Sequence, residues 1–133
     1  MSIDLNKDYT RQEQLELDLS DLFSQGITDK TGQMRPEIQS IGVAATALQA
    51  EADGVPVEMV GRIVTTAHEI SLNEAKAYPE DLVEELEKRN HPALAKLIRL
   101  GIAACRTDAD YQLFKRWLVL LHNMMIIRSK QNN

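Results

Sequence analysis

The sequence predicts an all-α fold, a single compact bundle of five to six helices around a mostly apolar C-terminal helix. Residues 117–127, WLVLLHNMMII, contain nine apolar residues out of eleven within a segment, 108–130, that has no Gly or Pro. A helix that is apolar on nearly every side needs neighbours on nearly every side. Each of the four prolines precedes an apolar pattern of helical period, as expected at the start of a helix. Aromatic residues make up only 5% of the chain, which favours helices over a β-sandwich.

Apolar periodicity, together with start and stop signals, divides the chain into six expected helices. The longest loop, 26–35, contains two glycines and is interpreted as a connector. No segment has the alternation of apolar and polar residues that is typical of a strand. The expected helices span 8–25, 36–52, 56–71 (or onward to 77), 79–89, 92–106 and 108–130.

Several local signals make these expectations more specific. Thr10 and Glu13, and Ser71 and Glu74, have the spacing of a capping box, so the first helix has a start signal and the third helix can break at Ser71. Thr107 is expected to cap the last helix, with Asp110 three residues on, and the short link before it makes the last two helices antiparallel neighbours. The apolar face expected for helix 36–52 consists of Ile38, Ile41, Ala45 and Leu48.

Length and composition are those of one soluble domain that spans residues 1–133. The chain has one cysteine, Cys105, which indicates a reducing compartment, and its place on an apolar helix face indicates a buried small hydrophobe. The N-terminus lacks the basic and apolar regions of a secretory signal. The apolar run 113–127 is too short to span a bilayer. We therefore expect a cytoplasmic protein without membrane contact.

Charge is distributed unevenly between the two parts of the chain. Residues 1–87 hold 6 Lys and Arg against 18 Asp and Glu, whereas residues 88–133 hold 9 against 2. Such asymmetry indicates either a polyanion-binding end or two halves that attract each other. If the basic stripes of the last two helices face the same way, they could contact nucleic acid. The residues of that candidate surface are Lys96, Arg99, Arg106, Lys115, Arg116 and His122.

Catalytic chemistry has little support in the sequence. No metal-binding, phosphate-binding or dinucleotide-binding motif is present, so we expect no cofactor, no metal and no enzyme. Arg116 and His122 form an Arg-x5-His spacing that resembles the HEPN ribonuclease superfamily, in which such a pair cleaves RNA where two protomers meet. The resemblance covers these two residues only, and Trp117 stands where the family usually has a polar residue. It implies a ribonuclease that depends on His122.

The leading functional prediction is a small helical interaction protein, a regulator or a non-catalytic subunit of a larger complex. The last helix is expected to contact another protein, or a second copy, through Trp117, Leu121, Met124 and Met125. The alternative interpretation of the methionines is that they belong to the core. The alternative function is a subunit that contacts RNA or DNA, because small helical subunits of RNA-guided defence complexes are similar in size and class.

Overall fold

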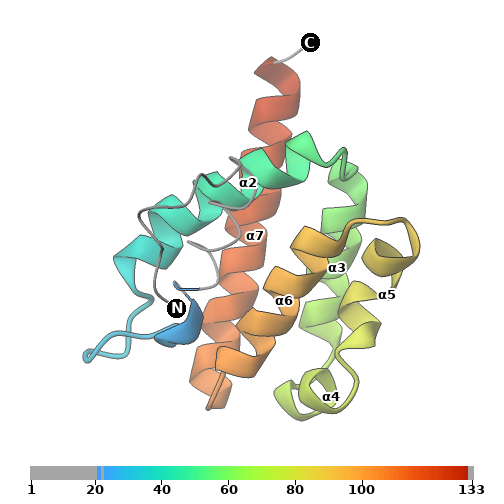
Figure 1. The fold of residues 1–133 in the computed structure, drawn as a ribbon. Helices are drawn as coiled ribbons and strands as arrows, with labels where there is room; N and C mark the ends of the chain where they lie inside the picture. Colours follow the sequence, from blue (N-terminus) through green and yellow to red (C-terminus); the bar gives the residue numbers. More distant parts are fainter. Residues whose placement is uncertain (1–20, 22, 132–133) are drawn as a thin grey trace, which may run out of the picture.

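The computed structural model describes residues 21 and 23–131, and every named element in this part of the chain is helical (Figure 1). The predicted all-α fold is therefore confirmed. A π-helical segment η1 precedes six α-helices, and the predicted boundaries agree with theirs to within a few residues. The elements are η1 (Ile38–Gly42), α2 (Val43–Ala52), α3 (Val57–Glu69), α4 (Leu72–Ala77), α5 (Glu80–Lys88), α6 (Pro92–Ala104) and α7 (Asp108–Gln131).

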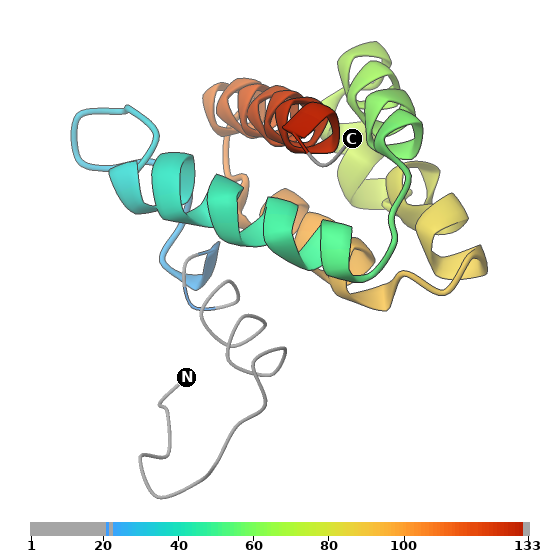
Figure 2. The ribbon, with the colours of Figure 1, turned by 90° about the horizontal axis from the view of Figure 1, so that it is seen from above.

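Helix α7 is the element against which the others are arranged. It packs chiefly against α2 and α3, and it also contacts α6. Seen from above, α2 and α3 lie on its two sides, while α5 and α6 lie beneath (Figure 2). Helices α6 and α7 run in opposite directions, as the short link predicts, and the C-terminal turns of α7 project beyond the rest of the bundle (Figure 1).

Two capping boxes fix helix boundaries where the sequence predicts them. The Glu74 backbone N–H donates to Ser71 Oγ at 3.1 Å, and the Ser71 N–H donates back to the Glu74 carboxylate at 3.3 Å. This reciprocal pair of hydrogen bonds caps the N-terminus of α4 and so separates α4 from α3. The same arrangement joins Thr107 and Asp110 at the start of α7. The break at Ser71 and the cap at Thr107 are both confirmed.

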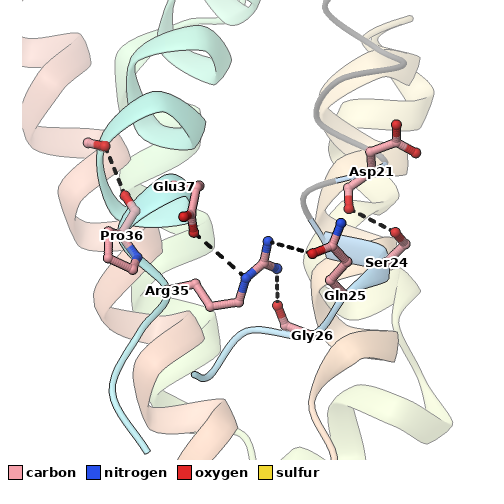
Figure 3. A network of polar contacts seen from close by, with 8 residues as sticks. Asp21, Ser24, Gln25, Gly26, Arg35, Pro36 and Glu37 are labelled. Atoms are coloured by element: carbon pink, nitrogen blue, oxygen red, sulfur yellow. Dashed lines mark hydrogen bonds and ion pairs between the residues drawn. The ribbon is translucent and has the colours of Figure 1, made fainter. Parts of the chain in front are cut away.

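The loop before η1 is held by Arg35 (Figure 3). Its guanidinium donates to the Gly26 carbonyl at 2.6 Å and to the Gln25 side chain at 3.4 Å, and it lies 3.8 Å from the Glu37 carboxylate. At the tip of the loop, the Thr31 hydroxyl donates a hydrogen bond to the Asp29 carboxylate, and backbone N–H groups donate to it as well. These hydrogen bonds, chiefly the one from the Thr31 side chain, lower the pKa of Asp29. These contacts agree with the interpretation of 26–35 as a structured connector.

The predicted face of helix 36–52 is right for Ile38 and for Ala45, which packs in part against the core, and wrong for Ile41 and Leu48. Ile38 is buried, but Ile41 is 64% exposed and Leu48 lies at the surface. The buried side of α2 consists instead of Val43, Thr46, Ala47, Gln49 and Ala50. The π turn causes the shift, because its i→i+5 hydrogen bonds bring residues five apart to about one turn's separation, whereas such residues lie about 140° apart in an α-helix. Ile38 and Val43 therefore face the core together.

The predicted helix 8–25, with its cap at Thr10 and Glu13, lies almost wholly outside the described residues. Its described C-terminal part contributes Phe23, which is buried. The Phe23 ring meets Trp117 of α7 edge-on, with the ring centroids 5.4 Å apart. Phe114 stacks on the same indole at 6.0 Å. Three aromatic rings thus form the centre of the core beside α7.

Candidate functional site

The structure places most of the predicted partner contacts in the core. Trp117 and Leu121 are fully buried and Met125 is 5% exposed, whereas Met124 is half-buried. The assignment of Trp117, Leu121 and Met125 to a partner-binding surface is therefore corrected. These side chains lie on the side of α7 that α2, α3 and α6 cover, so that the bundle itself occupies the positions where a partner was expected.

The opposite side of α7 faces away from the bundle. Phe114 marks the inward direction because it contacts Gly101 of α6, and Asn123 lies about 180° round an ideal helix from Phe114. All residues on this side are exposed or half-buried. We call them the outer α7 face, and they are Arg116, Val119, Leu120, Asn123, Ile126, Ile127 and Lys130.

Four of the seven side chains on the outer α7 face are large aliphatics. Ile127 is 52% exposed, and Val119, Leu120 and Ile126 are half-buried. They form two adjacent pairs, Val119 with Leu120 and Ile126 with Ile127, which lie seven residues apart on the same side of the helix with Asn123 between them. We call these two pairs the apolar stripe. Leu120 packs in part against the core, so Ile127 is the most exposed member of the stripe. An apolar surface that is left partly exposed is typical of a surface that another chain covers.

The charge of the outer α7 face is entirely positive. Arg116 and Lys130 are exposed, and α7 has no Asp or Glu after Asp110. Arg128 belongs to the side of the helix next to α2, where it forms an ion pair with Glu51 at 2.6 Å. Within the part of the chain that the structure describes, no carboxylate lies within 4.0 Å of Arg116 or Lys130.

The two basic stripes of the C-terminal half do not share a face. A Cβ on Gly101 would lie 2.2 Å from the Phe114 ring, so α6 meets α7 on its Gly101 side. Arg99 lies about 160° round α6 from Gly101 and therefore points away from α7. It forms an ion pair with Glu87 of α5 at 2.8 Å. Lys96 and Arg99 thus face the opposite side of the bundle from Arg116, and the premise of a basic surface shared by α6 and α7 is wrong for these residues. Arg106 lies after the end of α6, in the link to α7.

Lys115 and His122 lie at the seam between α7 and α3. Lys115 Nζ is 5.1 Å from the centroid of the Tyr111 ring, and the Tyr111 hydroxyl donates to the Ala67 carbonyl of α3 at 2.7 Å. His122 packs on Gly61, where an added Cβ would lie 3.1 Å from its Nε2 atom. His122 therefore points toward α3, whereas Arg116 points to solvent. Within one chain, the two residues of the Arg-x5-His spacing leave α7 on different sides.

Cys105 is buried, as the sequence predicts, and its thiol donates to the Gly101 carbonyl at 3.3 Å. Burial is the main reason that the pKa of this thiol rises to about 12. Since the thiolate is the reactive form, we expect Cys105 in the folded protein to resist a thiol reagent at pH 8 and to react at once in urea. Stopped-flow absorbance with a disulfide reagent measures both rates. Fast reaction without denaturant would contradict the buried position.

Other kinds of site have no counterpart in the described residues. They contain no group of three His, Cys, Asp or Glu side chains placed to hold a metal ion. None of the helices from η1 to α7 combines the length and apolar content that crossing a bilayer requires. A pocket of about 350 Å³ lies beside the α2–α3 turn, and it is lined by Glu51, Gly54, Val55, Pro56, Val57, Met125 and Ser129.

The fold and its surface define the class of protein, a small α-helical bundle with an apolar, positively charged outer helix face. Comparison with protein-family models, with curated proteins and with solved structures finds no match for this chain. The sequence contains a pattern of polar residues that indicates this face, although the high apolar content of 117–127 makes the pattern hard to recognise. Arg116, Asn123 and Lys130 recur every seven residues and so mark one side of the helix, with the aliphatic residues on both of its flanks.

Proposed function

We propose that this protein is a helical interaction module that binds another protein chain through the outer α7 face. The observation that carries the proposal is the partly exposed apolar stripe of Val119, Leu120, Ile126 and Ile127 on the outer side of the helix around which the bundle is built. Burying such a stripe against a second chain removes apolar surface from water, at about 25 cal/mol per Å². A surface of this kind suits a regulator or a non-catalytic subunit.

The position of the stripe supports this function. The outer α7 face is part of a 24-residue helix whose opposite side is packed into the core. A partner that docks on α7 would therefore meet a rigid surface and would order few side chains on binding. The aliphatic residues are flanked by Arg116 and Lys130, and a polar rim around an apolar centre is the usual anatomy of a protein–protein interface.

Site-specific photo-crosslinking in the native cell tests the proposal. A photoreactive amino acid at Asn123, in the centre of the outer α7 face, is expected to give a discrete higher-mass adduct that contains a second protein. The same amino acid at Ala103, which is exposed on α6, serves as the matched control and is expected to give none. Equal labelling at both positions, or none at Asn123, would overturn the proposal.

The variant Ile127→Asp sharpens this test. Because Ile127 is half exposed, we expect the aspartate to change the free energy of unfolding by no more than about 0.5 kcal/mol. The adduct at position 123 should nevertheless disappear, since a carboxylate would be buried in the apolar interface. Ile41→Asp is the control, because Ile41 is also an exposed isoleucine but lies in η1. It should leave the adduct unchanged.

A further inference from the structure

The outer α7 face has a pattern that is symmetric about Asn123. Aliphatic residues stand three residues before and after it, at Leu120 and Ile126, and four residues before and after it, at Val119 and Ile127. Cations stand seven residues away on each side, at Arg116 and Lys130. The face therefore has two aliphatic pairs, one on each side of Asn123, and one positive charge at each end.

The spacing of the two cations sets the size of what this face can hold. Fourteen residues separate Arg116 from Lys130, which corresponds to about 21 Å along the helix axis. That distance is about four helical turns, and a helix laid along the stripe would meet both cations. Since the pattern is the same in both directions, a partner helix can satisfy it in either orientation.

The charges decide what kind of helix fits. No carboxylate among the described residues pairs with Arg116 or Lys130, so the two cations are available to a ligand. Complementary potentials across an interface favour association, and like charges placed together oppose it. The partner helix should therefore have an apolar stripe with carboxylates near both of its ends.

A second copy of this chain fits the face less well. Two α7 helices related by a two-fold axis at Asn123 would place the aliphatic residues together, but Arg116 of each would lie beside Lys130 of the other. A parallel arrangement would place identical cations side by side. Either arrangement brings two pairs of like charges together without a carboxylate from α7 between them.

From these observations we propose that the occupant of the outer α7 face is an acidic amphipathic helix of another protein. Its apolar side covers Leu120, Ile126 and their neighbours, and its carboxylates pair with Arg116 and Lys130. This inference rests on the proposed function and deepens it, because it names the chemistry of the partner. The experiment below separates the failure of one from the failure of the other.

Two synthetic helical peptides of about 18 residues provide the probes, long enough to span about 27 Å. They share one leucine stripe and differ only in the flanking residues, which are glutamate in one peptide and lysine in the other. Binding to the full chain is followed by fluorescence anisotropy and by NMR chemical-shift mapping across a salt series. We expect the glutamate peptide to bind about tenfold more tightly than the lysine peptide and to weaken as salt rises.

Charge-reversal variants test whether Arg116 and Lys130 cause the preference for the glutamate peptide. The double variant Arg116→Glu, Lys130→Glu should bind the lysine peptide more tightly than the glutamate peptide. Lys96→Glu together with Arg99→Glu makes the same change in net charge on the side of α6 that points away from α7, and it is the matched control. This control should keep the wild-type preference, which separates a local charge effect from the net charge of the protein.

Several outcomes would overturn the inference. Equal affinity for the two peptides, or no binding of either at millimolar concentration, would exclude an acidic helix as the occupant. Sedimentation showing a dimer that Ile127→Asp dissociates would assign the face to a second copy. Tight binding of a labelled RNA oligonucleotide that Arg116→Glu abolishes and Ile127→Asp leaves intact would assign it to nucleic acid. If the crosslink at position 123 persists without a charge preference, the proposed function stands and only the partner chemistry fails.

Discussion

Replacing Trp117 with alanine is expected to lower the free energy of unfolding by about 4 kcal/mol, the usual effect of removing a large buried aromatic side chain. The indole is fully buried and packs against the rings of Phe23 and Phe114. Its Nε1–H also donates to the Ile38 carbonyl at 2.9 Å. The substitution therefore removes the centre of the core and a contact that ties α7 to the π turn.

Urea unfolding followed by circular dichroism measures this loss, and Trp117→Phe separates its two causes. The phenylalanine keeps most of the buried apolar surface but cannot donate a hydrogen bond to Ile38, so we expect a smaller loss of about 1–2 kcal/mol. If Trp117→Ala proved as stable as the wild-type protein but lost a partner, Trp117 would be a surface contact, as the sequence alone predicted, and the core described here would be wrong.

Gly101→Ala is the second substitution with a large expected effect. A methyl group at this position would lie 2.2 Å from Cε1 and 2.7 Å from Cζ of Phe114. The Phe114 ring cannot move away freely, because it is fully buried and stacks on Trp117 with an interplanar angle of 10°. Alanine has the higher helix propensity by about 1 kcal/mol, but the steric overlap costs more, so we expect a net loss of about 2 kcal/mol.

A double-mutant cycle tests whether this contact is the cause. Phe114→Leu shortens the side chain that meets the new methyl group, so Gly101→Ala should be less destabilising in the Phe114→Leu background than in the wild-type protein. Gly61→Ala is the control on α3. Its neighbour is the half-buried ring of His122 at 3.1 Å, which can shift, so a smaller loss is expected. Strict additivity in the cycle would show that the two residues do not interact.

The boundaries of most helices could be predicted because their signals act within a few residues. The capping box of Ser71 and Glu74 ends one helix and starts another through contacts no longer than a single turn. Pro92 at the start of α6 and the Thr107 cap of α7 act in the same way. The antiparallel arrangement of α6 and α7 followed from the shortness of their link.

The side of α7 that carries the candidate site could not be predicted from apolar content. Residues 117–127 are apolar on nearly every side, so periodicity assigns no side of this segment to the core, and Trp117 was predicted to contact a partner. The hydrophobic effect is non-directional, so which apolar residues are buried depends on where α2, α3 and α6 lie. The structure buries Trp117 and exposes Ile127.

The distinction between local signals and tertiary packing holds for the whole protein. The sequence by itself determined the fold class, the places where helices begin and end, and the excess of positive charge after residue 87. Only the tertiary structure decided that Ile38 and Val43 share a face, that Lys96 and Arg99 point away from the side that carries Arg116, and that the apolar stripe remains on the outside of α7. Local hydrogen bonds fix where helices begin and end, whereas packing between distant segments fixes which sides are buried.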